Sequence, residues 1–168
     1  MRKVSIIIAL LLSVAASAQN SGKGFTSASE YSVGGSMSSD GFILSTYSVS
    51  LGYRFNDVLS VYVPFGLAST VESTDLGRSG SFNGTVGAGL GARFGLMGNY
   101  AGELCLQAST TVVSDDPGFF CGGARLRFGS GKSRGYSPYL SIGLDYWQRW
   151  KGDSCNRLVP SIGWGFKF

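Results

Sequence analysis

The C-terminal stretch Leu158–Phe168, with the sequence LVPSIGWGFKF, shows the pattern that decides the fold. Its even-numbered residues are mostly large and apolar, whereas the residues between them are mostly small or polar. Successive side chains of a β-strand point to opposite faces of the sheet, so this alternation predicts a strand with one apolar face. Strands of soluble domains are usually about 5–6 residues long, and strands that cross a bilayer need about 9–11 residues. The length of this stretch therefore favours a strand that crosses a membrane.

The same alternation recurs upstream, which gives eight predicted strands. They are Glu30–Ser38, Ile43–Phe55, Val58–Val71, Phe82–Phe94, Tyr100–Val112, Phe120–Phe128, Tyr136–Tyr146 and Leu158–Phe168. Tight turns alternate with the longer, more polar connections Ser73–Ser81, Ser114–Gly118 and Lys151–Asn156, as in bacterial barrels with external loops. Pro64 and Pro160 fall inside strands and each removes a hydrogen bond, so we expect a local bulge at each. The sequence thus predicts an all-β fold, an eight-stranded antiparallel up-and-down transmembrane β-barrel.

The composition excludes several other classes of protein. Charged residues make up 14% of the chain and aromatic residues 13%, unlike a disordered chain with high charge and few aromatics. The 26 glycines follow no G-X-Y period, which excludes a collagen triple helix. The absence of histidine excludes a Ser-His-Asp triad, a Cys-His pair and a His-ligated metal site. The formal net charge of +4 includes Arg2 and Lys3; without these two the charge is +2, which is too small to indicate a nucleic-acid partner.

The first residues have the pattern of a secretory signal peptide. Met1-Arg2-Lys3 is a positively charged start, Val4–Ala16 is apolar apart from two serines, and Ala16-Ser17-Ala18 is a small-x-small cleavage site. The apolar run is shorter than the roughly 20 residues that a membrane-spanning helix needs. We therefore expect residues 1–18 to be a cleaved signal peptide and residues 19–168 to form the barrel domain.

The polar face of the predicted strands carries eight charged residues. They are Glu30, Arg54, Arg93, Glu103, Arg125, Arg127, Asp145 and Lys167. An eight-stranded barrel is only wide enough to be filled by side chains, so the many aromatic residues fit better outside, facing lipid, than inside. The charges then lie in the lumen, where burial requires that they pair. We expect Arg93 and Arg127 on the two sides of Glu103, and Arg54 or Lys167 beside Glu30.

These features together resemble a known family. The signal peptide, the eight alternating strands and the terminal Phe168 are similar to the small outer-membrane β-barrel proteins of the OmpA/OmpX type, over the whole of residues 19–168. The resemblance implies a location in the bacterial outer membrane, contact with its lipids, and insertion by the barrel assembly machinery. It also implies that the last strand is the signal read by this machinery, through Leu158, Ile162, Trp164, Phe166 and Phe168.

Catalysis is not expected of this chain. Lipid A deacylases, palmitoyltransferases and omptin proteases of this barrel class use an essential histidine, which the chain lacks. No cofactor is predicted, and three cysteines without histidine do not indicate a metal site. Cys121 and Cys155 both fall near the predicted outer rim, so any disulfide of this exported chain is expected to join them and to leave Cys105 free.

Three functions remain open on the sequence. The favoured interpretation is a monomeric, non-enzymatic outer-membrane scaffold whose external loops contact an unknown partner. The first alternative is a narrow pore for small solutes with a preference for anions, because the inward-facing bases outnumber the inward-facing acids. The second alternative is a soluble, exported, lipocalin-like barrel whose apolar face points inward around an apolar ligand.

Overall fold

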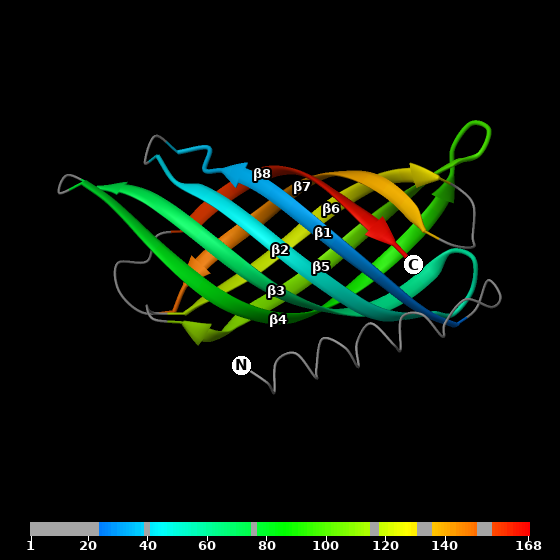
Figure 1. Ribbon diagram of the computed structural model, residues 1–168, viewed down its shortest axis with the longest axis horizontal. Helices are drawn as coiled ribbons and strands as arrows, with labels where there is room; N and C mark the ends of the chain where they lie inside the picture. Colours follow the sequence, from blue (N-terminus) through cyan, green and yellow to red (C-terminus); the bar gives the residue numbers. More distant parts are fainter. Residues whose placement is uncertain (1–23, 39–40, 75–76, 115–117, 131–135, 151–155) are drawn as a thin grey trace.

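The strands form a closed barrel in the order in which they occur in the chain. The computed structural model describes residues 24–38, 41–74, 77–114, 118–130, 136–150 and 156–168, and the predicted signal peptide lies outside them. The strands are β1 (Gly24–Gly35), β2 (Ile43–Arg54), β3 (Leu59–Thr74), β4 (Gly77–Gly95), β5 (Tyr100–Ser114), β6 (Phe119–Ser130), β7 (Ser137–Arg149) and β8 (Asn156–Lys167). Each strand pairs antiparallel with the next, and β8 pairs with β1 to close the barrel (Figure 1). The predicted all-β, up-and-down, eight-stranded barrel is thereby confirmed. Within the described ranges, no helix has the length and apolar character needed to cross a membrane.

The two ends of the barrel differ in their connections. One end, which we call the terminal end, holds the start of β1, the end of β8 and the connections after β2, β4 and β6. The opposite end, which we call the loop end, holds the connections after β1, β3, β5 and β7. At the terminal end Ser27 and Phe168 exchange two backbone hydrogen bonds, with N···O distances of 3.4 and 2.9 Å. These bonds extend the pairing of the first and last strands to the last residue of the chain.

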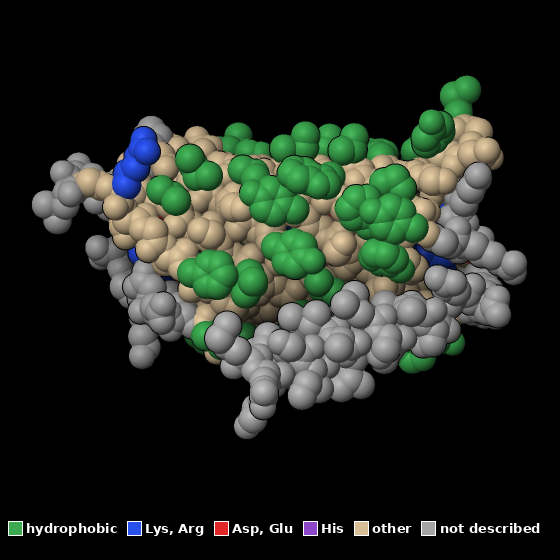
Figure 2. Space-filling view, in the orientation of Figure 1, with side chains coloured by type: hydrophobic (Ala, Val, Ile, Leu, Met, Phe, Trp, Pro, Cys, Tyr) green, Lys and Arg blue, Asp and Glu red, His purple; other side chains and the backbone are tan. Residues whose placement is uncertain are grey.

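Side chains alternate between the outside and the lumen along the strands. In β8, Leu158, Ile162 and Trp164 are exposed, whereas Val159 and Ser161 are buried. Figure 2 shows hydrophobic side chains spread over the middle of the visible outer face, whereas Lys and Arg side chains appear there only at the ends of the barrel. The apolar face of the predicted strands is therefore the outer face.

The β3–β4 hairpin is longer than the alternation predicts. The predicted loop Ser73–Ser81 is wrong, because Ser73 pairs with Arg78 and the ladder continues until only residues 75–76 separate the strands. Backbone N–H and C=O groups pair whatever side chains they carry, so the hairpin extends beyond the apolar sequence into polar sequence. The other two predicted external loops, Ser114–Gly118 and Lys151–Asn156, lie largely outside the described residues.

The bulges predicted at Pro64 and Pro160 do not occur. The register of β3 with β4 is the same on both sides of Pro64, although Pro64 itself has no partner in β4. Pro160 lies just beyond Ser161, the last residue of β8 that pairs with β1. A proline is tolerated in a ladder where the neighbouring strand makes no bond to it, so neither residue disturbs the pairing. The irregularity lies instead between Gly84 and Thr85, where the register of β4 with β5 shifts.

Apolar side chains fill the lumen near the loop end. This apolar plug consists of the buried residues Phe42, Leu44, Ala68, Phe119, Cys121, Trp147 and Val159. The rings of Phe119 and Trp147 are in contact, with centroids 3.9 Å apart. Leu44 breaks the alternation of its predicted strand, and it does so because it points into the plug, where it is 1% exposed. The lumen therefore has an apolar layer as well as a charged one.

Truncation of Leu44 to alanine is expected to lower the free energy of unfolding by about 2–5 kcal/mol, as large-to-small changes in packed cores do. The matched control is Ile43→Ala at the adjacent outward-facing position, which is 52% exposed and should cost much less. Urea unfolding of both variants in the same detergent micelles, followed by tryptophan fluorescence, measures the two losses. Equal losses would show that the plug is not packed as a core.

Candidate functional site

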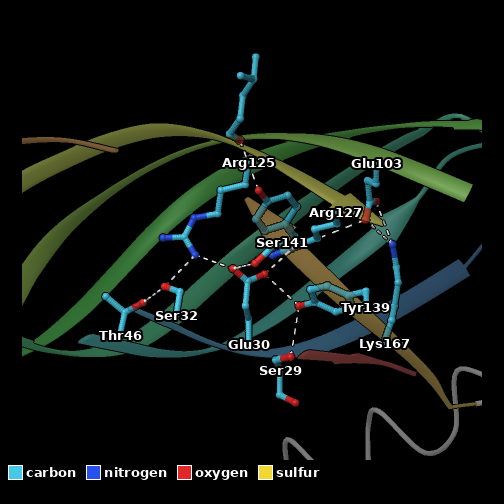
Figure 3. Close-up of polar contacts among 12 residues, drawn as sticks. Ser29, Glu30, Ser32, Thr46, Glu103, Arg125, Arg127, Tyr139, Ser141 and Lys167 are labelled. Carbon is cyan, nitrogen blue, oxygen red and sulfur yellow. Dashed lines mark hydrogen bonds and ion pairs between the residues drawn. The ribbon is translucent and has the colours of Figure 1, made fainter. Parts of the chain in front are cut away.

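The middle of the lumen holds a network of ion pairs centred on Glu30 of β1. Its carboxylate accepts hydrogen bonds from Arg125 Nη1 at 2.5 Å and Arg127 Nε at 2.8 Å, both on β6. The hydroxyl groups of Tyr139 and Ser141, on β7, donate to it at 3.0 and 3.2 Å. Figure 3 shows these side chains converging on Glu30. Glu30 is 2% exposed, so these four donors replace the water that its carboxylate loses on burial.

Arg125 connects Glu30 with a second carboxylate. Its Nη2 donates to Asp145 Oδ2 on β7 at 2.8 Å, and Asp145 is fully buried. Arg125 and Arg127 thus face Glu30 and Asp145, so the charges of this middle layer balance. A buried ion pair offsets the cost of its desolvation only where the geometry is good and further hydrogen bonds satisfy the remaining atoms. The Glu30 carboxylate meets both conditions, whereas Arg125 Nε and Asp145 Oδ1 are buried without a hydrogen-bond partner within the described residues.

A third carboxylate, that of Glu103 on β5, lies nearer the terminal end. Lys167 Nζ on β8 donates to its two oxygens at 2.8 and 2.7 Å. Arg127 Nη1 lies 4.0 Å from Glu103 Oε2, so Arg127 connects this pair with Glu30. The ion pairs together join β1, β5, β6, β7 and β8 across the lumen. Their main physical effect is to hold opposite walls of the barrel together.

The remaining two predicted interior charges lie close to Glu103. The strand register places Arg93 of β4 opposite Glu103, and Arg127 opposite it on the other side, which are the positions expected from the sequence. Arg54 is 9% exposed and lies within electrostatic range of Arg93 and Glu103. Among the described residues, its guanidinium forms neither a hydrogen bond nor an ion pair. The terminal end of the lumen therefore holds more positive than negative groups around Glu103.

The expectation that Arg54 or Lys167 pairs with Glu30 is wrong. The register places Arg54 opposite Gly24, and Lys167 opposite Ala28, so both lie nearer the terminal end than Glu30 does. The lumen is narrow enough for the long arginine side chains of β6 to cross it. A partner therefore need not come from a neighbouring strand. The predicted partners of Glu30 were taken from the strands next to β1, which is why they are wrong.

A second ion cluster, at the loop end, was not predicted. Glu72 Oε1 on β3 accepts hydrogen bonds from Arg149 Nη2 on β7 at 2.6 Å and Arg157 Nη1 on β8 at 2.7 Å. The Arg157 guanidinium also lies over the ring of Phe42, 4.4 Å from its centroid, which is a favourable cation–π contact. Each of these residues has the parity of the inward-facing residues of its strand. Extending the predicted strands by a few residues would have indicated them.

Glycines make room for the ionic side chains. A Cβ atom added at Gly143 would lie 2.9 Å from Cγ of Arg125, and one added at Gly91 would lie 2.9 Å from Oε1 of Glu103. Such contacts are closer than real Cβ atoms show, so alanine at either position would displace a charged group. The glycine content of the sequence is explained in part by this need for space.

Cys105 and Cys121 are buried free thiols. Cys155, which the sequence suggested as the disulfide partner of Cys121, lies outside the described residues. In the part of the chain that the structure describes, no group of three or more Cys, Asp or Glu side chains is placed to hold a metal ion. The arrangement that the lumen does show is a set of paired charges that link strands.

Replacement of Glu30 by glutamine is expected to lower the free energy of unfolding by about 3–5 kcal/mol, because two buried guanidinium groups lose a shared counter-charge. The matched control is Glu72→Gln, which should cost clearly less because the Arg149 side chain is 31% exposed and can be hydrated instead. The urea midpoint of each variant in detergent micelles gives the comparison. Similar losses in the two variants would contradict a special role for the middle layer.

Comparison with known proteins found a similarity that covers most of the chain, to a solved structure. No protein-family model matches the sequence, and no curated protein matches it. The structure is similar to the crystal structure of the N-terminal β-barrel domain of Pseudomonas aeruginosa OprF, with a TM-score of 0.46 and 11% sequence identity. The similarity covers 85% of this chain and 97% of that domain.

Proposed function

We propose that this protein is a non-enzymatic, monomeric integral protein of the bacterial outer membrane, whose role is that of a scaffold that presents its loop end to a partner. The observation that carries this proposal is the polarity of the barrel, which has large apolar side chains outside and paired charges inside. The chain would reach the membrane through a cleaved signal peptide at residues 1–18. In this orientation the terminal end faces the periplasm and the loop end faces the exterior.

The outer surface supports a lipid environment. Its exposed apolar side chains come from all eight strands and include Val33, Tyr47, Val63, Leu90, Leu106, Leu126, Leu140 and Ile162. Soluble monomers rarely expose a continuous apolar patch of more than a few hundred Å². A closed barrel in lipid also satisfies all its backbone hydrogen bonds between strands, which a bilayer requires. A belt of this kind is therefore expected to be covered by lipid.

Exposed aromatic side chains gather towards the two ends of the belt. At the terminal end they include Tyr53, Phe55, Phe94, Tyr100, Phe128, Tyr136 and Phe168, and towards the loop end Phe82, Phe120 and Tyr146. Aromatic girdles at both membrane interfaces are typical of outer-membrane barrels. The rings of Tyr136 and Phe166 stack, with centroids 4.5 Å apart. The distance between the girdles is set by the length of the strands.

The interior does not fit the soluble alternative. A lipocalin-like barrel would need an apolar lumen around its ligand, whereas Glu30, Arg125, Arg127 and Asp145 occupy the middle of this one. The apolar plug is itself closely packed and lies only towards the loop end. An apolar ligand in the middle of the lumen would have to displace paired, buried charges, which is costly.

The packing of the lumen also argues against a pore. Side chains that line an open aqueous channel stay accessible to water, but Val159, Asp145 and Cys105 are 0% exposed. These residues belong to three different strands, and the plug and the ion network lie one behind the other along the barrel axis. We therefore propose a lumen that is closed to solutes. Small barrels of eight strands are generally filled by side chains in this way.

The last strand supports a role in assembly. In β8, Leu158, Ile162 and Trp164 face outward, and Phe166 is half-buried beside Tyr136; Phe168, directly after the strand, is also exposed. The same strand pairs with β1 and closes the barrel. We propose that this outward row is the signal that the barrel assembly machinery binds before closure.

A charge on the lipid-facing side distinguishes a membrane barrel from a soluble one. Leu106→Arg, in the middle of β5, is expected to cost about 2–4 kcal/mol of folding free energy in vesicles, and Tyr100→Arg at the end of the same strand about 0–1 kcal/mol. The folded form is the gel band whose migration changes when the sample is boiled. The measurement is the urea concentration at which half of the protein has lost this band. In a water-soluble barrel neither arginine would cost stability, and the protein would stay soluble without detergent.

Planar-bilayer recordings are expected to show no discrete current steps for the wild-type protein, because plug and ion network fill the lumen. The control is a variant with both Leu44→Ala and Phe119→Ala, recorded in the same bilayer. Its shortened side chains leave space in the plug at the loop end. Regular current steps from the wild-type protein would instead support the solute-pore alternative. Loss of those steps in Arg125→Gln would assign the current to the lumen.

A further inference from the structure

Positive charge is concentrated at the terminal end of the barrel. Arg54, Arg93 and Lys167 lie there among the described residues, and the carboxylates there are Glu103 and Asp57. The middle layer is neutral and cannot offset this excess. The terminal end is thus suited to a partner with negative charge.

The positive groups at the terminal end lie close enough to repel one another. Arg54 lies within electrostatic range of both Arg93 and Lys167, and Lys167 is already bonded to Glu103. Within the described residues the Arg54 guanidinium has no hydrogen bond, and the carboxylates that attract it are those of Glu103 and Asp57. A further anion bound at the terminal end would therefore lower the repulsion within this cluster. Arginine is well suited to phosphate, which accepts two parallel hydrogen bonds from a guanidinium.

A groove beside this cluster joins charged and apolar surface. It has a volume of about 530 Å³ and is lined by Arg93, Asn99, Phe94, Leu96, Tyr100 and Asp57, among others. The backbone N–H of Arg93 donates to the carbonyl oxygen of Val58 at 2.7 Å, and this bond connects the β2–β3 turn with β4 along the groove. Leu96 N–H donates to Tyr100 O at 3.0 Å and closes the β4–β5 turn on the other side. One edge is thus polar, and the other continues into the aromatic girdle.

We propose that this groove binds the headgroup of an anionic phospholipid from the periplasmic leaflet, with the phosphate at Arg93, within electrostatic range of Arg54, and the acyl chains along Phe94, Leu96 and Tyr100. The inference rests on the proposed membrane location, which puts the groove at the depth of the headgroups. A free anion would use only the arginines, whereas a lipid also uses the apolar edge. Asp57 lies on the same groove, but the cations at this end outnumber the carboxylates, which favours a headgroup with net negative charge.

The test is native mass spectrometry of the folded protein released from mixed vesicles of phosphatidylcholine with either phosphatidylglycerol or phosphatidylethanolamine. We expect phosphatidylglycerol to be retained in preference to phosphatidylcholine. Arg93→Gln should weaken this preference about fivefold, the change expected for one cation near anionic lipid. Arg93→Lys should keep most of the preference. The matched control is Arg78→Gln, which removes the same charge from the other end of β4 and should leave the preference unchanged.

Folding of each variant is checked in vesicles of phosphatidylcholine alone, by the difference in migration of the protein on a gel before and after boiling. Should Arg93→Gln fail to fold, Arg54→Gln replaces it in the comparison. Normal insertion with no lipid preference, an equal loss of preference in Arg78→Gln, or a preference for phosphatidylethanolamine overturns the inference but leaves the proposed function standing. Failure of the wild-type protein to insert into any vesicle overturns the proposed function and the inference with it.

Discussion

The carboxylate of Glu30, held by two arginines that reach across the lumen, is the interaction on which the rest of the interior depends. It fixes the distance between β1 and β6, because Arg125 and Arg127 bond it at 2.5 and 2.8 Å. Arg125 carries the connection on to Asp145, and Arg127 carries it towards Glu103. Removing Glu30 would leave the two buried guanidinium groups of β6 with only Asp145 and Glu103 as counter-charges, and β1 would lose its ionic link to β6 across the lumen.

This constraint explains the layers of the lumen. Buried charged side chains require ion-pair partners and hydrogen bonds. Both are available only where opposite walls of the barrel carry acidic and basic residues at the same level along the barrel axis. Towards the loop end the inward residues are instead apolar and pack as a plug, with Glu72, Arg149 and Arg157 beyond it. The outer surface requires the opposite kind of side chain, because apolar groups are stable in lipid and unpaired charges are costly there. A two-residue period along each strand satisfies both demands at once.

The same period explains what could be predicted from the sequence. Alternation in Leu158–Phe168 and its counterparts was enough for the strand number, the closed barrel and the direction of most side chains. It was not enough for partners across the lumen, such as Arg125 with Glu30, because these depend on barrel width and shear rather than on neighbouring strands. Strand ends were also missed in β1 and in the β3–β4 hairpin, because backbone pairing continues where the apolar pattern has stopped. The cluster around Glu72 was overlooked for that reason.

The seam between β1 and β8 has a kinetic consequence. It pairs only the segment from Ala28 to Gly34 with the segment from Ser161 to Lys167, and these pairs join the most distant parts of the described chain. Contacts of such high sequence separation form late, since the entropy of closing a long loop must be met first. The salt bridge from Lys167 to β5 and those from Glu30 to β6 anchor both seam strands to the middle of the sheet. We therefore expect the joining of these two edges to be the last folding step, and the ion pairs to limit the time for which either edge is open to aggregation.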